Sequence, residues 1–201
     1  MIAFKPPYRH HPWRRTIVIA AFAVLVLLDL SPGGAGSPSP ARAASNRFDE
    51  YTVKAAYLYN FAKFVEWPEG SFSSVDSPLT ICVMGSDPFK ANLDTIAKNT
   101  VRGRKIAIKR LSGVEGVSQC QTVFVSREER GLVPSLIDAV RDRHILTIGE
   151  AGDFCRLGGI INLYTENDRV RFEINIDAAE RAGLTISSEL LKLAAIRREG
   201  K

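Results

Sequence analysis

Histidine is scarce in this 201-residue chain, which has only three. Two of them precede Pro12, so His144 is the one histidine in the remainder. No HExxH motif, no His/Cys spacing typical of zinc sites and no complete Ser-His-Asp set can be assembled around it. His144 with Cys155 is the one conceivable nucleophile pair, and no orienting motif accompanies it. We therefore expect no metal site, no cofactor and no catalytic residue.

Excess charge is also missing once the N-terminal segment is set aside. Residues 1–43 hold five of the 27 Lys/Arg and one of the 22 Asp/Glu, which leaves 22 basic and 21 acidic side chains in residues 44–201. The basic side chains that gather between Arg102 and Arg110 have no aromatic residues among them. A solvated strand edge is expected there, and nucleic-acid binding is not.

A long hydrophobic run is absent too. The apolar stretch from Thr16 to Leu28 covers 13 residues, whereas a membrane-spanning helix needs about 20. A basic head precedes it, and a small-x-small site, Ala41-Arg42-Ala43, follows. This order predicts a secretory signal peptide over residues 1–43 and an exported domain over 44–201 that does not itself span a membrane. The alternatives are a retained anchor or a lipid anchor, but no cysteine follows the run to accept a lipid.

Strand and helix patterns alternate along the exported part. Short apolar runs predict buried strands at 79–85, 121–126 and 144–148, and KIAIK (105–109) alternates like a strand. Asn167-Asp168 joins two β-rich runs into an antiparallel hairpin over 159–176. Helices are expected from about Asp49 to Trp67 and over residues 88–98, 132–142, 153–157, 177–182 and 187–197. The fold class is therefore α/β: a single-domain sandwich with a mostly parallel central sheet flanked by helices and the hairpin at its edge.

Aromatic residues gather in YTVKAAYLYNFAKFVEWP, residues 51–68. Val53, Tyr57, Phe61 and Phe64 form one helical stripe and are expected in the core, with Asp49 and Glu50 at the helix start. Tyr59 and Trp67 lie off that line, so they are candidates for contact with a partner protein.

The polar face of the hairpin, Arg171, Glu173 and Asn175, is a second candidate partner surface. The alternative is an ordinary solvated face. A small-molecule site is a further possibility, because three loops leave the carboxyl ends of the buried strands. Its candidate ligand-binding residues are Ser86, Asp87, Arg127, Glu150 and Asp153, and the alternative is that they serve only as turn and cap residues.

The three cysteines matter in an exported protein. Cys82 lies inside the first buried strand and Cys120 immediately precedes the second. If these strands are neighbours, the two thiols can form a disulfide, which we favour over two buried free thiols. Cys155 is left over, and is either buried and inert or an accessible redox thiol.

The exported part as a whole resembles the YfiR-like periplasmic proteins. The likeness runs from about Tyr51 to Ile196. The segments that carry it, in the family's order, are VKAAYLYNFAKFVEWP, ICVxGxDPF, V-x-GRKI, CQxVFVS, ILTIGExxDFCRxGGIINL and RVRFEINxxAAxxAGLxISSxLLKLAAI.

This resemblance implies a non-enzymatic periplasmic repressor, often dimeric. Such a protein binds the periplasmic domain of a membrane-bound diguanylate cyclase and keeps it inactive. Its release under envelope or redox stress raises cyclic di-GMP and favours biofilm formation. Cys82 and Cys120 match the family's bridging pair. Cys155 matches half of a second pair, but the following GGIINLY has no cysteine, which departs from the family pattern. The other hypothesis is a periplasmic small-molecule-binding module.

Overall fold

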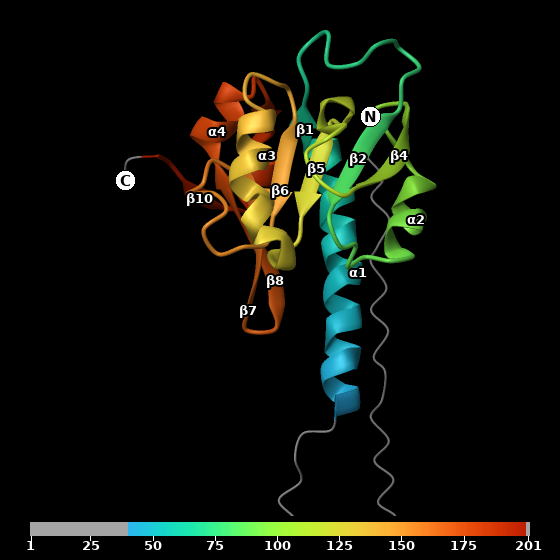
Figure 1. The fold of residues 1–201 in the computed structure, drawn as a ribbon, viewed down its shortest axis with the longest axis vertical. Helices are drawn as coiled ribbons and strands as arrows, with labels where there is room; N and C mark the ends of the chain where they lie inside the picture. Colours follow the sequence, from blue (N-terminus) through green and yellow to red (C-terminus); the bar gives the residue numbers. More distant parts are fainter. Residues whose placement is uncertain (1–39, 200–201) are drawn as a thin grey trace, which may run out of the picture. The chain divides into compact units, whose positions relative to one another are not determined.

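The computed structural model of this protein describes residues 40–199, and its side chains from Glu50 onward (Figure 1). The predicted signal peptide lies almost entirely outside these residues and stays a prediction. Among residues 40–199, no helix combines the length and the apolar content that crossing a membrane requires.

The first helix, α1, runs from Pro40 to Phe64 and so begins well before the predicted start near Asp49. Its buried face is formed by Ala55, Leu58 and Phe61, which are spaced three residues apart. Val53, predicted as core, is 43% exposed because the buried face runs one to two residues out of phase with it. Figure 1 shows the amino-terminal end of α1 extending past the ends of the strands.

The central sheet has eight strands in the order β10-β8-β7-β6-β5-β2-β4-β3. The strands β2, β4, β5, β6 and β7 are parallel, β8 is antiparallel to β7, β3 is antiparallel to β4, and β10 is parallel to β8. In chain order the bounds are β2 Leu79–Met84, β3 Thr100–Val101, β4 Arg104–Leu111, β5 Thr122–Val125, β6 Leu146–Gly149, β7 Ile161–Glu166, β8 Arg169–Asn175 and β10 Ala195–Arg197. The short strands β1 (Val65–Glu66) and β9 (Thr185–Ile186) pair separately.

Helices cover both faces of the sheet, so the core has two parts. On one face α1 and α2 (Asn92–Ala97) enclose the larger cluster around Phe61 and Phe124. On the other, α3 (Val133–Ala139) encloses a smaller cluster around Phe154. The remaining helical segments are η1 (Val117–Gln119), η2 (Arg127–Leu132), α4 (Ile176–Arg181) and α5 (Ser188–Leu191). The predicted α/β class with a mostly parallel sheet is confirmed.

Three predicted helices differ from the structure. The helix expected from Pro88 begins at Asn92, because the Asp87 carboxylate accepts the Phe89 N–H at 2.8 Å and closes a turn instead. Residues 153–157 form turns rather than helix. The helix expected over 187–197 ends at Leu191, and Ala195–Arg197 forms β10. The hairpin is therefore not the edge of the sheet, because β10 pairs with its outer strand.

Candidate functional site

The loops after β2, β5 and β6 meet where the strand order reverses, the place at which open α/β sheets usually bind ligands. The structure brings several of the predicted ligand-binding residues together here. The backbone N–H of Arg127 donates to Glu150 Oε1 at 3.1 Å. Ser86 donates through its hydroxyl to Glu129 Oε1 at 3.2 Å.

A lysine from α1 lies buried beside these loops. Lys54 forms an ion pair with Glu150, and both side chains are only 1% exposed. Its Nζ also lies 2.7 Å from Glu50 Oε1 and 4.6 Å from the centre of the Tyr51 ring. The Tyr51 hydroxyl donates to Glu150 Oε1 at 3.0 Å. Lys54 was not among the predicted site residues, although it lies four residues before Leu58 and seven before Phe61, in phase with the buried face of the helix.

The neighbouring charges and the burial of this cluster fix the protonation states of Glu50 and Tyr51. Burial of Tyr51 and the neighbouring Glu150 carboxylate raise the pKa of its hydroxyl well above the ordinary value. Burial alone would raise the pKa of Glu50, but the hydrogen bond and the charge of Lys54 outweigh it and lower that pKa. Glu50 and Tyr51 thus remain a carboxylate and a neutral hydroxyl across the physiological pH range, and both hold α1 to the sheet.

The two remaining predicted ligand residues are also engaged within the chain. Arg110 Nε donates to Asp87 Oδ2 at 2.8 Å. Asp153 accepts from Arg130 Nε at 3.0 Å, and this bond lowers the pKa of the Asp153 carboxyl. A ligand in the crevice would have to replace these bonds, and ligand binding there stays a prediction.

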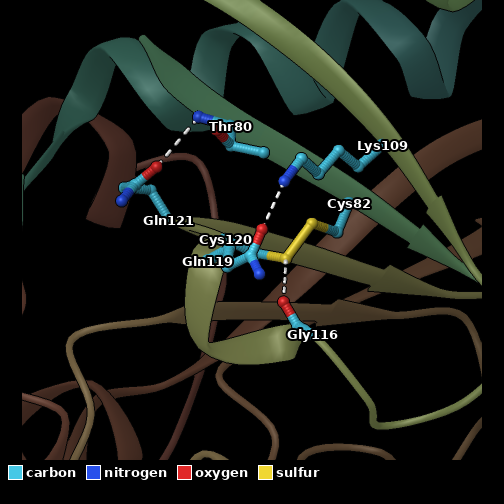
Figure 2. Close-up of a disulfide and its surroundings, with 7 residues drawn as sticks. All are labelled: Thr80, Cys82, Lys109, Gly116, Gln119, Cys120 and Gln121. Atoms are coloured by element: carbon cyan, nitrogen blue, oxygen red, sulfur yellow. Dashed lines mark hydrogen bonds between the residues drawn. A yellow bond between two sulfur atoms is a disulfide. The ribbon is translucent and has the colours of Figure 1, made fainter. Parts of the chain in front are cut away.

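The disulfide between Cys82 and Cys120 joins β2 to the segment just before β5, two residues ahead of its first residue, Thr122 (Figure 2). Because β2 and β5 are parallel neighbours, the two Cα atoms lie 5.9 Å apart, within the range of disulfides. Gln121, the next residue, accepts the Thr80 N–H through its side chain at 2.9 Å. The predicted bridge is confirmed.

Cys155 is a free thiol that is 1% exposed. Its Sγ lies 3.6 Å from the carbonyl oxygen of Ile160. Burial, followed by the Glu173 charge, raises the pKa of this thiol to about 12. Thiolate, the reactive form, is therefore rare at neutral pH. A redox role for Cys155 stays a prediction.

Tyr59 and Trp67, the predicted partner contacts of the first helix, are half-buried. The Tyr59 hydroxyl donates to the carbonyl oxygen of Thr100 at 3.3 Å. Trp67 Nε1 donates to the carbonyl oxygen of Gln121 at 3.2 Å, and its ring packs edge-on against Phe72. Each ring keeps an accessible part, and the partner-binding role of both stays a prediction.

The predicted polar face of the hairpin is only partly exposed. Arg171 is exposed and pairs with Glu166 at 2.9 Å. Glu173 is 8% exposed and Asn175 is fully buried, so neither lies on an open polar face as predicted, and partner binding through these two residues stays a prediction. The physical reason is β10, whose Arg197 pairs with Glu173 at 2.8 Å.

Beside Arg171 lies a groove of about 470 Å³ between α1, the hairpin and the turn after α5. Leu193, at its rim, is 75% exposed. The groove is lined by Tyr57, Tyr164, Arg169, Val170, Arg171, Phe172, Leu193, Ala194 and Ala195. Tyrosine and arginine around an apolar floor are typical of surfaces that bind proteins.

These features define a disulfide-bonded α/β domain with a closed ion-pair cluster at its switch point and an open aromatic groove on one side. Among the residues that the structure describes, no three His, Cys, Asp or Glu side chains cluster closely enough to hold a metal ion. The family model described as YfiR/HmsC-like matches residues 51–195. The chain belongs to the YfiR/HmsC-like family.

Solved structures show a related fold. A conserved domain protein from Vibrio cholerae O1 biovar eltor is 13% identical with a TM-score of 0.51, and the match covers 74% of this chain and 60% of that one. An ABC domain from Streptococcus pneumonia, solved in complex with L-Trp, is 13% identical with a TM-score of 0.43, covering 58% of this chain and 54% of that one. This chain spans less than two thirds of either structure's length. At this identity the first likeness concerns the fold alone.

Family membership supports a periplasmic regulatory role, because YfiR-like proteins are periplasmic regulators rather than enzymes. Formation of a dimer stays a prediction from the resemblance.

Proposed function

We propose that this protein represses a membrane-bound diguanylate cyclase by binding the cyclase's periplasmic domain. Family membership supports a regulatory role, and the aromatic groove beside the hairpin carries the proposal on the structural side. Its rim combines a mostly exposed leucine, Leu193, with tyrosines and exposed arginines. Release of the repressor would then let the cyclase produce cyclic di-GMP and favour biofilm formation.

The groove offers the two kinds of contact that a specific protein interface needs. Leu193 supplies an apolar anchor that water surrounds in the free protein. Arg171, paired only with the exposed Glu166, can exchange that partner for a carboxylate of the cyclase at little cost. Trp67 lies near β5 and offers a second, independent contact.

The test is capture of membrane proteins from native envelope with the full chain. We expect mass spectrometry to find a diguanylate cyclase with a periplasmic domain. Leu193→Asp and Arg171→Glu should abolish its capture, whereas Trp67→Ala tests the second surface.

Arg141→Glu serves as the matched control, since Arg141 is exposed, pairs with Asp138 and does not line the groove. The captured cyclase, reconstituted in liposomes with its periplasmic domain outside, should lose activity when the wild-type protein is added. Capture of no cyclase, or equal capture by Leu193→Asp and wild type, would contradict the proposal.

A further inference from the structure

The C-terminal segment, residues 195–199, is attached to the sheet by few apolar contacts. Its strand β10 pairs with β8 over three residues, from Ala195 opposite Glu173 to Arg197 opposite Asn175. Ala195 is exposed and Ile196 is 47% exposed. Hydrophobic burial therefore stabilises this edge strand only weakly.

Ion pairs hold the segment instead. Arg197 Nη2 lies 2.8 Å from Glu173 Oε2, and Glu199 Oε2 accepts from Arg181 at 2.7 Å. Asp177 accepts from Arg198 at 3.1 Å. The arginines are 41% exposed or more, so salt screens these attractions. The family match ends at Ala195, so the ion-paired residues of the segment lie outside the matched range.

The surface beneath the segment is polar. Glu173 and Asn175 are buried there, and Asn175 Nδ2 donates to the carbonyl oxygen of Cys155 at 2.9 Å. Asn162 donates to Glu173 Oε1 at 3.2 Å, while its own Oδ1 is buried without a hydrogen-bond partner. Water or a new strand can satisfy such groups, so uncovering this face costs less than uncovering an apolar core.

We propose that the C-terminal segment is displaceable and that β8, once uncovered, accepts an extended basic segment of the regulated partner as a replacement strand. This inference rests on the proposed function. Removing the segment leaves the Glu173 and Asp177 carboxylates without their arginines. The incoming strand must therefore carry a cation in register with Glu173, and main-chain hydrogen bonds along β8 supply the remaining attraction.

Thiol modification reports displacement, because Asn175 Nδ2 donates both to the carbonyl oxygen of Cys155 and to Glu199 Oε1 in the segment. Cys155 is also the one free thiol, since the other two cysteines are bridged. In the full chain, Arg197→Gln should speed the reaction of Cys155 with a maleimide about five- to tenfold by removing a charged hydrogen-bonded pair. Raising the salt concentration to about 0.5 M should speed it in the wild type as well.

The control is Arg141→Gln, which breaks an exposed ion pair on α3 and its following turn and should leave the rate unchanged. Thermal unfolding of each variant shows that the rates are compared between folded proteins. Equal rates for Arg197→Gln and Arg141→Gln, without a salt effect, would overturn displacement.

Replacement is tested with a fluorescent peptide of residues 192–199 and the full chain carrying Arg197→Glu, whose new carboxylate repels Glu173. Anisotropy should show binding that weakens with salt, and the same peptide with Arg197→Glu should not bind. Failure of the unaltered peptide to bind, or equal binding of both, would refute a replacement strand. Neither measurement involves the cyclase, so a negative result here leaves the capture experiment as a separate test of the proposed function.

Discussion

At the scale of single residues, Lys54 has the largest consequence for stability. A lysine side chain that is 1% exposed has left water almost completely, and this is tolerable only because Glu150 and Glu50 neutralise it. The cluster also fixes the position of α1, since the Lys54 ammonium can pair with Glu150 only when the helix is docked in this position. Such pairs stabilise less than their geometry suggests, but breaking one is costly.

Lys54→Met should therefore lower the free energy of unfolding by about 3–5 kcal/mol, because Glu150 is left buried without its cation. The double variant Lys54→Met with Glu150→Leu should recover most of this loss. Urea unfolding followed by circular dichroism measures both. Lys63→Met on the exposed side of the same helix is the control, and a double variant as unstable as the single would contradict the explanation.

The disulfide gives a second prediction at this scale. Replacing Cys82 and Cys120 together by serine should lower the free energy of unfolding by about 3–4 kcal/mol, because the bridge closes a long loop in the unfolded chain. The bridged residues are 38 positions apart. Reductant should lower the unfolding temperature of the wild type to a similar extent and leave that of the double variant unchanged. Two free thiols found at these positions in native material would contradict the bridge.

At the scale of elements, the hairpin turn carries backbone strain. Asn167 and Asp168 both have positive φ, 50° and 58°, the combination that a tight turn between twisted strands requires. Asn and Asp tolerate this region better than other side chains, but glycine adopts it without cost.

Asp168→Gly should therefore raise the free energy of unfolding by about 1 kcal/mol, while Asn167→Val should lower it by about 1–3 kcal/mol. Denaturant titration gives both values. The control is Asp76→Gly, in an exposed loop at negative φ, where added freedom of the unfolded chain should slightly destabilise. Stabilisation by Asp76→Gly as large as that by Asp168→Gly would show that φ is not the cause.

The elements also show how far the sequence could predict this fold. The runs LTICVM and TVFV were recognisable because parallel strands buried on both faces are apolar throughout. The end of the chain was not: residues 195–197 read as helix, yet they lie as a strand along β8. Three residues carry too little local preference to outweigh a neighbouring strand with unpaired main-chain groups.

The same limit applies to the candidate site. The alternation of Arg171, Glu173 and Asn175 correctly places them on one face, but the sequence alone does not reveal that β10 covers two of them. Lys54 was overlooked because a lysine in a helix is normally solvated. Its burial depends on Glu150, which lies 96 residues away and which the sequence does not connect to it.

At the scale of the whole molecule, stability should be greatest near neutral pH. Folding lowers the pKa of Glu50, Asp153 and Glu199. The unfolded chain therefore takes up protons first as the pH falls through their ordinary range, and stability is lost in that direction. Folding raises the pKa of Cys155 from 9.0 to about 12, so the unfolded chain releases this proton first and stability also falls as the pH rises above about 9.

Thermal unfolding across the pH range measures both losses of stability, the acid limb below neutral pH and the alkaline limb above about pH 9. Cys155→Ala should shift the onset of the alkaline loss upward, toward the range where tyrosine titrates, and leave the acid limb unchanged. An alkaline limb that is identical in Cys155→Ala and wild type would show that another group causes it.

The position of α1 also sets an order of events during synthesis. This helix comes first in the described chain, yet its Tyr57 hydroxyl donates to the carbonyl oxygen of Val170, 113 residues later. When a chain emerges with its amino-terminal end first, this helix can dock against the hairpin only after almost the full length has emerged. Docking of α1 against the hairpin is thereby delayed until nearly the whole chain has been synthesised.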